Sequence, residues 1–466
     1  MLKFNTDDTI VALATPPGSG AIAVVRLSGK NAFEIGGSVF LSGRGRKPDF
    51  SKLTSHTAHF GTLSKEGKVV DEVVMTIFKG PRSYSGEDTL EFSCHGSVFV
   101  QQKVLDLLIL AGARMAQPGE FTLRAFLNGK LDLSQAEAVA DLIAADSSAA
   151  HRAAIGQLRG GYSSRLRELR SELIRFAALI ELELDFSEED VEFADRQQLR
   201  ESVERLQESL RHLISSFELG NVIRNGIPVV IAGRPNAGKS TLLNALLDEE
   251  RAIVSDIAGT TRDTIEEEIT IGGVKFRFID TAGIRETNDA IERIGVERTL
   301  EKIRQSPVII YLFDVNETTR GALTKELDDL RAHTDPSFTL LPVGNKIDHY
   351  DLAQLEEEFR NVPGILLVSA KEGTNLDTLR SNLLERFSSG EFGEGDTVVT
   401  SARHAAELRK TEEALGNVLK GLESGVTGDL VAGDLRYALH HLGLITGAIS
   451  NEDLLDTIFS KFCIGK

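Results

Sequence analysis

The sequence predicts a multidomain protein that combines a P-loop α/β domain with an all-α part and a smaller α+β domain. Residues 223–388 alternate between apolar strand-like runs and amphipathic helix-like runs, which is typical of a doubly wound sheet. Residues 131–222 and 389–466 show helical periodicity, and residues 1–130 mix short strands with a helix. A chain of 466 residues is too long for one ordinary domain, so this division is reasonable.

The composition is typical of a folded protein without a secretory or membrane character. Hydrophobic residues make up 41% of the chain, which is enough for sizeable cores. The net charge of −18 argues against a general nucleic-acid coat, although a local basic patch or an RNA handled jointly with a partner remains compatible. Cys94 and Cys463 are too few for a disulfide framework or a zinc site. We therefore expect a soluble, reduced, cytoplasmic protein with no membrane partner.

Residues 1–130 are expected to form a modest α+β domain. Four short apolar runs predict strands, at residues 9–14, 21–27, 73–78 and 89–92. One helix is predicted over residues 98–110 and is closed by Gly112.

The flanking helical segments are expected to bury one face each. The pattern from Ser134 to Glu137 resembles a capping box and predicts a helix start. Further helices are predicted at 163–184, around Leu199 to Phe217, and from about 400 to 461. The flanks fit either a separate C-terminal domain or an α/β domain inserted into one helical domain, and periodicity leaves both open.

A phosphate-binding loop is predicted from Gly233 to Ser240. It follows an apolar strand-like run and precedes a helix-like run, which is the context such a loop requires. Gly233 and Gly238 let the backbone turn tightly and approach an anion with its N–H groups. Lys239 is expected to reach the β- and γ-phosphates, and Ser240 to hold Mg²⁺. The nucleotide contacts expected in this loop are Asn236, Ala237, Gly238, Lys239, Ser240 and Thr241.

Two later stretches are expected to complete the phosphate and metal site. In the first, Thr261 can complete the Mg²⁺ shell and sense the γ-phosphate. In the second, a strand delivers Asp280 to the metal, and Gly283 can offer an N–H to the γ-phosphate. The contacts expected from both stretches are Ser255, Asp256, Ile257, Ala258, Gly259, Thr260, Thr261, Asp280, Thr281, Ala282 and Gly283.

The last two motifs predict that the base is guanine. Asp348 can accept hydrogen bonds from the ring N1–H and the exocyclic amine of guanine, a pair that adenine does not offer. The backbone of residues 369–371 can support the guanine carbonyl. The expected base contacts are Asn345, Lys346, Asp348, Ser369, Ala370 and Lys371. All five motifs in this order predict a GTPase rather than an ATPase.

One departure from signalling GTPases concerns the attacking water. Ile284 stands where those proteins have a glutamine that orients the water, and an isoleucine side chain cannot do so. Polar residues just downstream could take over, and chemistry alone does not choose among Arg285, Glu286, Asn288, Asp289, Glu292 and Arg293.

Outside the generic motifs, the chain resembles the MnmE (TrmE) family of tRNA-modification GTPases over essentially its whole length. The resemblance is carried by residues 9–18, 84–91, 118–133 and 462–466. It implies a tetrahydrofolate-binding, dimer-forming domain at residues 1–130 and one helical domain built from residues 131–222 and 389–466. A Ras-like GTPase domain, residues 223–388, would be inserted between the two helical segments.

The resemblance also implies an activity. The family's homodimer acts with the flavoprotein MnmG (GidA), in a heterotetramer-type complex, on certain tRNAs. It installs a carboxymethylaminomethyl-type group at C5 of the wobble uridine, and a formyl- or methylene-tetrahydrofolate is the presumed one-carbon source. Binding of GTP and K⁺ brings the two GTPase domains together, and hydrolysis releases them.

By the same resemblance, the folate contacts would be Arg26, Glu91, Lys130 and Lys466. Arginine and lysine suit the two carboxylates of a folate tail, and a glutamate can accept from the pterin N–H and amine. Without the resemblance, Arg26 and Glu91 would be ordinary charges at strand ends. Cys463 lies close to this end of the chain, and either a contribution to the site or a simple buried thiol is compatible with the sequence.

The resemblance implies a potassium site and a catalytic glutamate as well. The K⁺ ligands would be Asn236, Ser255, Ile257 and Thr260. A cation between the phosphates offsets developing negative charge and could replace an arginine finger. Glu292 matches the family's catalytic glutamate, which acts through a bridging water, so Glu292 and Lys239 form the expected catalytic set.

Two other functions share part of this pattern. A ribosome-assembly GTPase of the Era or Der kind shares the phosphate loop and the missing glutamine, but it appends a basic RNA-binding domain. An interaction scaffold that only binds nucleotide would not need Ser240, Thr261, Asp280 and Glu292 together. Folate binding by residues 1–130 would discriminate against both.

Overall fold

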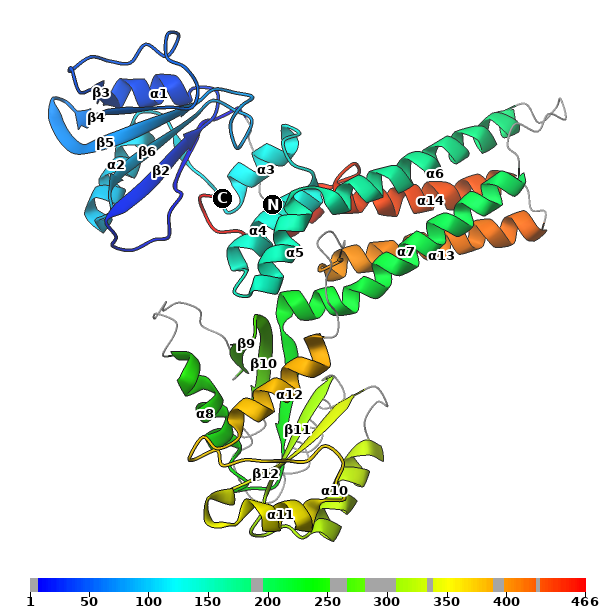
Figure 1. Ribbon diagram of the computed structural model, residues 1–466. Coiled ribbons are helices and arrows are strands. Elements are labelled where there is room, and N and C mark those ends of the chain that lie inside the picture. The colour runs from blue at the N-terminus through cyan, green and yellow to red at the C-terminus, as the bar shows by residue number, and fades with distance from the viewer. Residues whose placement is uncertain are drawn as a thin grey trace, which may run out of the picture. The chain divides into compact units, whose positions relative to one another are not determined.

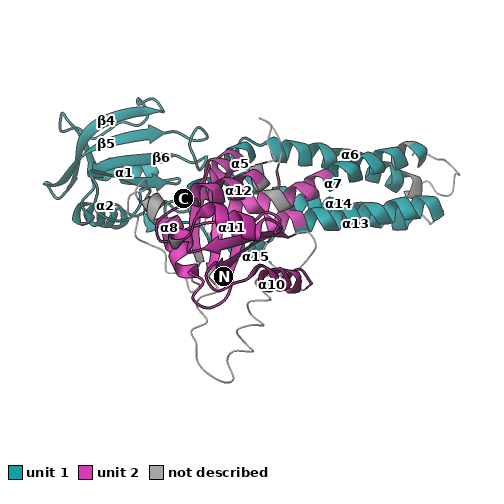
Figure 2. Ribbon diagram, turned by 60° about the horizontal axis from the view of Figure 1, so that its bottom comes forward, with its two compact units in different colours: residues 1–143, 155–211, 406–466 teal, residues 144–154, 212–405 magenta. Residues whose placement is uncertain are grey.

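The computed structural model describes residues 7–185, 196–251, 266–280, 307–332, 338–388, 398–424 and 428–466 (Figure 1). The chain divides into two compact units, shown in different colours in Figure 2. One unit comprises residues 1–143, 155–211 and 406–466, and the other comprises residues 144–154 and 212–405. Helical sequence from before and after the α/β block therefore belongs to one unit, and the predicted fold class is confirmed. The domain limits at 130, 222 and 388 stay predictions.

The first unit contains a seven-stranded sheet in the order β3-β4-β5-β6-β2-β1-β7. The β1–β7 pair is parallel, and the other pairs are antiparallel. The strands are β1 Ile10–Leu13, β2 Ile22–Ser28, β3 Phe40–Ser42, β4 Thr57–Lys65, β5 Lys68–Phe78, β6 Thr89–His95 and β7 Arg114–Met115. All four predicted strands are confirmed, whereas β3, β4 and β7 were not predicted.

Two helices cover one face of this sheet. Helix α1 (Ala32–Val39) and helix α2 (Val98–Leu110) bury their apolar side chains against alternate residues of the central strands, such as Met75 and Phe92. The bounds predicted for α2 are confirmed, and Ser97 caps it by accepting a hydrogen bond from the N–H of Val100. On the other face, a small cluster around Phe121 of α3 (Glu120–Leu127) covers β1.

The helical part of the chain consists of long helices with one buried stripe each. They are α4 Leu133–Ala144, α5 Ser148–Leu158, α6 Gly161–Asp185, α7 Arg196–Asn225, α13 Ala402–Ser424, α14 Gly428–Thr446 and α15 Glu452–Phe459. Helices α6 and α14 lie side by side in both views, although more than two hundred residues separate them in the chain (Figures 1 and 2). The C-terminal α15 packs with α3 and α4 through a cluster that includes Leu123, Leu133 and Phe459.

The capping box predicted at Ser134 to Glu137 is wrong in its position. The structure places it two residues earlier, because Asp132 accepts from the N–H of Gln135 (2.9 Å) and the Gln135 side chain accepts from the N–H of Asp132 (3.0 Å). Ser134 is buried and donates its hydroxyl to Asp132 at 2.8 Å. An aspartate therefore serves as the N-cap, and the serine supports it.

The second unit contains a six-stranded sheet in the order β13-β12-β11-β8-β10-β9, in which only the β9–β10 pair is antiparallel. The strands are β8 Ile227–Ala232, β9 Glu266–Ile271, β10 Val274–Asp280, β11 Val308–Asp314, β12 Thr339–Asn345 and β13 Leu366–Leu367. Its described helices are α8 Lys239–Arg251, α10 Arg320–Ala332, α11 Leu352–Phe359 and α12 Leu376–Ser388.

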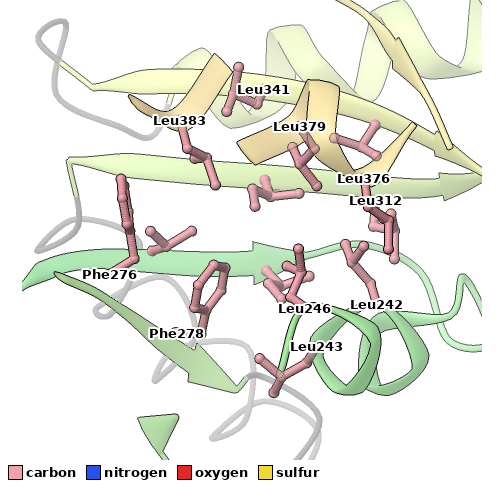
Figure 3. Close-up of a cluster of buried hydrophobic side chains, with 14 of the residues drawn as sticks. Leu242, Leu243, Leu246, Phe276, Phe278, Leu312, Leu341, Leu376, Leu379 and Leu383 are labelled. Carbon is pink, nitrogen blue, oxygen red and sulfur yellow. The ribbon is translucent and has the colours of Figure 1, made fainter. Parts of the chain in front are cut away.

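Apolar clusters lie on both faces of this sheet, as expected for a doubly wound fold. On one face, leucines of α8 and α12 pack on Phe276, Phe278 and Leu312 (Figure 3). On the other face, α10 and α11 contribute Leu323 and Phe359. This packing fixes the carboxyl ends of β8, β11 and β12 at one edge, where the nucleotide motifs begin.

Candidate functional site

The predicted phosphate loop joins β8 to α8 and is closely supported by its neighbours. Gly233 has φ +149°, and a Cβ atom there would stand 2.0 Å from the carbonyl oxygen of Leu312 on β11. Gly238 has φ +96°, and a Cβ atom there would stand 2.3 Å from Nδ2 of Asn345. Both positions therefore require glycine, for the backbone conformation and for the close approach of the adjoining loop.

The ammonium group of Lys239 is held over this loop. Its Nζ donates to the carbonyl oxygen of Gly233 at 2.8 Å and to that of Arg234 at 2.9 Å. A cation fixed above a glycine loop at the N-terminus of α8 is a suitable receptor for a phosphate. Ser240 is the second residue of α8 and is exposed, so its hydroxyl fits the oxygen chemistry that Mg²⁺ prefers.

The predicted guanine loop is hydrogen-bonded directly to the phosphate loop. Asn345, at the end of β12, is almost completely buried and donates from Nδ2 to the carbonyl oxygen of Ala237 at 2.9 Å. Its Oδ1 accepts from the N–H of Ala370 at 3.0 Å. One amide side chain thus connects three of the predicted motifs, and Asn345 has a supporting role that its motif alone did not specify.

The remaining guanine-loop residues are also brought together. Asp348 accepts a hydrogen bond from the hydroxyl of Ser369, which orients its carboxylate. Ser369 in turn accepts from the N–H of Glu372 at 3.1 Å. These contacts give the carboxylate a defined direction, which is favourable for selectivity.

Asp314 is a site residue that the motifs did not reveal. Lys346 has φ +69°, and its Nζ donates to Oδ2 of Asp314 at 2.7 Å. Burial alone would raise the pKa of the Asp314 carboxyl, but hydrogen bonds from Lys346 and Asn316 outweigh it and hold the pKa below its usual range. A signal was present in the sequence, because Asp314 directly follows the apolar run of residues 308–313, and ligands bind at the carboxyl ends of such strands.

Much of the predicted switch chemistry lies outside the described residues. Those positions are Ser255, Asp256, Ile257, Ala258, Gly259, Thr260, Thr261, Thr281, Ala282, Gly283 and Glu292. Asp280 is described as the last residue of β10, where its backbone pairs with Ile231 of β8. Asn236 lies in the phosphate loop with φ +62° and is exposed. Thr241 and Lys371 are exposed as well.

Two of the four predicted folate residues form an ion pair on the N-terminal sheet. Arg26 of β2 and Glu91 of β6 are cross-strand partners, and Arg26 Nε donates to Glu91 Oε1 at 2.8 Å. The guanidinium of Arg26 also lies 5.2 Å from the ring centroid of Tyr84 and 5.6 Å from that of Phe121. These rings were not predicted as site residues, although Tyr84 begins one of the stretches that carry the family resemblance.

The other two predicted folate residues adjoin this region. Lys130 Nζ donates to the carbonyl oxygen of Pro81 at 2.9 Å. The side chain of Lys130 also lies against Gly86, and both contacts are with the loop of residues 79–88 that includes Tyr84. Lys466 follows Gly465, which lies so close to Leu13 that a Cβ atom would stand 2.1 Å from the Leu13 carbonyl oxygen. Leu13 is the residue after Ala12, the β1 partner of Arg26. All four predicted residues therefore stand on segments that contact one another.

The description of Cys463 as a simple buried thiol is wrong. Its side chain is exposed, while its carbonyl oxygen accepts from the N–H of Gly119 at 3.4 Å. The buried thiol is Cys94, whose pKa burial raises to about 11. The backbone of the C-terminal segment, rather than the sulfur, is what the fold anchors.

Comparison with known sequences decides the family. The family description "GTP-binding protein TrmE N-terminus" matches residues 9–130, and "MnmE helical domain" matches residues 133–463. A protein of Cytophaga hutchinsonii named tRNA modification GTPase MnmE is 56% identical over 99% of this chain and 98% of its own length. The chain belongs to the MnmE family. A relative of the same name in Flavobacterium psychrophilum is 53% identical over 98% of this chain and 99% of its own length. Another, in Christiangramia forsetii, is 50% identical over the whole of both chains.

Solved structures contribute less than these sequences. Era from Aquifex aeolicus is 29% identical over 40% of this chain and 66% of its own, with a TM-score of 0.28. A score of that size supports no argument about the whole chain, so membership of the MnmE family depends on the sequence relatives. Among the described residues, no helix is both long and apolar enough to cross a membrane.

Proposed function

We propose that this member of the MnmE family hydrolyses GTP and uses the reaction in modifying tRNA. The observation that supports this most strongly is the side chain of Asn345, which connects the guanine loop to the phosphate loop. A protein that recognises base and phosphates as one ligand benefits from such a connection, because both subsites are then held in register. Near full-length identity with proteins named tRNA modification GTPase supports the same function.

Within this function, Lys239 would bind the β- and γ-phosphates, and Ser240 with Thr261 would hold Mg²⁺. The metal supplies Lewis-acid neutralisation of the phosphates when it is bound. Asp348 would accept from the guanine N1–H and amine. Glu292 would position the attacking water through a second water, since Ile284 cannot do so.

A potassium ion is proposed as the activator. Asn236 would supply one ligand from the phosphate loop, and Ser255, Ile257 and Thr260 would supply the others. The exposed position of Asn236 and its left-handed backbone are compatible with a side chain that reaches a cation beside the phosphates. An Asn236→Ala variant is expected to lose most of the stimulation by K⁺; undiminished stimulation would contradict this assignment.

A tetrahydrofolate is proposed to bind beside Arg26 and Glu91. In this pair, the Glu91 carboxylate could accept from the pterin N–H and amine, and the Arg26 guanidinium could bind a ligand carboxylate. Lys130 and Lys466 would add positive charge for the glutamate tail. The bound folate would be the one-carbon donor for a carboxymethylaminomethyl-type group at C5 of the wobble uridine, made by a homodimer together with MnmG (GidA) in the cytoplasm.

The test is mass analysis of wobble uridines in bulk tRNA from a strain that lacks this protein. We expect the aminomethyl-type modification to disappear and to return with the wild-type chain but not with a Glu292→Ala variant. The purified variant is expected to lose turnover and to keep its affinity for GTP. Unchanged wobble uridines in the deletion strain would refute the tRNA function and would favour the ribosome-assembly alternative.

A further inference from the structure

Arg234 connects the phosphate loop to the neighbouring helix α10 through Glu326. Arg234 Nε donates to Glu326 Oε1 at 2.8 Å, and Arg234 Nη2 donates to the same oxygen. The other carboxylate oxygen, Oε2, accepts from the hydroxyl of Tyr311 on β11. Both carboxylate oxygens are thus engaged, and we refer to Arg234, Glu326 and Tyr311 together as the loop anchor.

The loop anchor is fixed from its inner side. Tyr311 is 7% exposed, and burial together with the hydrogen bond to Glu326 raises the pKa of its hydroxyl. The hydroxyl therefore stays protonated and remains a donor throughout the neutral range. Withdrawing the carboxylate would leave a buried hydroxyl without its acceptor, which is unfavourable, so Glu326 has one preferred position from which to hold Arg234.

The backbone of Arg234 contributes directly to the phosphate site. Its carbonyl oxygen accepts from Lys239 Nζ at 2.9 Å, beside the 2.8 Å bond to Gly233. Tyr311 pairs in the sheet with Ala232, the last residue before the loop. The start of the loop is therefore held at two points, by sheet pairing at Ala232 and by the side-chain contact of Arg234 with Glu326. These two contacts fix the carbonyl oxygens of Gly233 and Arg234, which in turn position the ammonium group of Lys239.

We propose that the loop anchor is a set of positioning residues for nucleotide binding, which holds the Lys239 ammonium where the β-phosphate binds. This inference rests on the proposed GTPase function and adds to it residues that lie outside the predicted contacts. The loop anchor touches neither the base nor the reacting phosphate. It should therefore strengthen the binding of GDP and of GTP by a similar factor.

The test compares Arg234→Met with a matched control on α10, the helix that carries Glu326. Methionine keeps the aliphatic reach of arginine and removes its charge and donors. Arg331→Met alters an exposed arginine of the same helix α10 that pairs with Asp328 at 3.2 Å. We expect Arg234→Met to release a fluorescent GDP analogue about three- to tenfold faster than the wild type, as for the loss of one partly exposed ion pair, and the control to match the wild type.

Two further measurements separate positioning from general stability. The KM of Arg234→Met for GTP is expected to rise, with a larger change in KM than in kcat. Its nucleotide-free melting temperature is expected to equal that of the Arg331→Met control. Arg234→Lys should recover part of the slow GDP release, because a lysine can still donate to Glu326, and Glu326→Gln should weaken binding in the same direction as Arg234→Met.

Each contrary outcome is decisive. GDP release from Arg234→Met at the wild-type rate, or equal acceleration in the Arg331→Met control, would overturn the loop anchor while leaving the GTPase function intact. A fall in kcat with unchanged affinity would also overturn it, because the residues would then act in the transition state. A wild-type chain that fails to bind GDP would overturn the proposed function and the loop anchor together.

Discussion

The side-chain amide of Asn345 donates to the carbonyl oxygen of Ala237 at 2.9 Å, which joins the guanine loop to the phosphate loop. The contact is possible only because Gly238 has no Cβ atom in the space that Nδ2 of Asn345 occupies. The two loops are therefore mutually supporting, and their spacing is a property of the protein rather than of the bound ligand.

Asn345→Ala is expected to weaken GDP and GTP binding together. The change removes two buried hydrogen bonds and leaves the Ala370 N–H and the Ala237 carbonyl without this partner. Losses of this kind correspond to an affinity about ten- to a hundredfold lower. Equilibrium titration with a fluorescent GDP analogue measures it. Wild-type affinity in a variant with a normal melting temperature would show that the connection between the loops does not contribute to binding.

Asp348→Asn is expected to exchange guanine for xanthine. The amide oxygen of an asparagine can still accept from the ring N1–H, but its NH2 group faces the guanine amine, so that two donors oppose each other. In xanthine a carbonyl replaces that amine, and the asparagine NH2 group can donate to it. Competition between GTP and XTP for the same site measures the change. Ser369→Ala is the matched control, because it removes the hydroxyl that orients Asp348 and keeps the carboxylate. The Ser369→Ala control should bind GTP more weakly without favouring XTP. If Asp348→Asn still preferred GTP over XTP, the assignment of Asp348 to the guanine base would be contradicted.

The sequence predicted the strongly patterned elements and left the weakly patterned ones undetected. Helix α2 was placed correctly because a long apolar run ends just before Gly112, and the structure adds Ser97 as its N-cap. Strand β4 was not predicted, since His59, Gly61 and Thr62 interrupt its apolar alternation. Such a strand is specified by its neighbour β5, to which it pairs along its whole length, and that information is not local.

The candidate site divides in the same way. Motif residues such as Lys239 and Asp348 could be predicted because their chemistry requires a fixed order along the chain. Tyr311 and Glu326 could not be assigned, because their roles arise from a contact between elements that only the fold brings together. Asp314 had a signal in its place after an apolar run, but its pairing with Lys346 is visible only in the fold. Arg26 and Glu91 were predicted from family resemblance, and the register of β2 with β6 supplies the reason that they meet.

Gly465→Ala is expected to weaken folate binding without unfolding the N-terminal domain. Gly465 has φ +101°, and a methyl group there would stand 2.1 Å from the carbonyl oxygen of Leu13, so the C-terminal Lys466 would be displaced. We expect the affinity for a tetrahydrofolate to fall about tenfold or more. Isothermal titration with 5-formyl-tetrahydrofolate measures this, and tRNA modification in a complemented strain gives an independent readout.

Gly45→Ala is the control for the change at Gly465. Gly45 also has a left-handed backbone, with φ +67°, but a Cβ atom there meets nothing within 4 Å. Both variants bear the strain of an alanine at positive φ, about 1–2 kcal/mol, and only Gly465→Ala displaces the chain end. Equal folate affinity in the two variants would show that Lys466 is not part of the folate site.

Asp314→Asn is expected to lower the stability of the GTPase part of the chain in a pH-dependent way. An aspartate in an unfolded chain has a pKa of about 3.9, and the pKa of Asp314 in the folded protein is lower, because Lys346 and Asn316 stabilise its charged form against the effect of burial. The folded state thus binds the proton more weakly than the unfolded state. The stabilisation is fully present above about pH 4 and is lost as the pH falls through the folded-state pKa.

Urea unfolding of Asp314→Asn and of the wild type between pH 3 and pH 7 tests this. The difference in unfolding free energy is expected to be largest at neutral pH and to shrink at the acidic end. Asp377→Asn, at an exposed carboxylate of α12 that pairs with Arg380 at 3.1 Å, is the control and should show a small difference that does not vary in this way. A difference for Asp314→Asn that stays constant from pH 7 to pH 3 would mean that the Lys346 contact does not stabilise the charged carboxylate. Lys346 would then hold its left-handed backbone without help from Asp314.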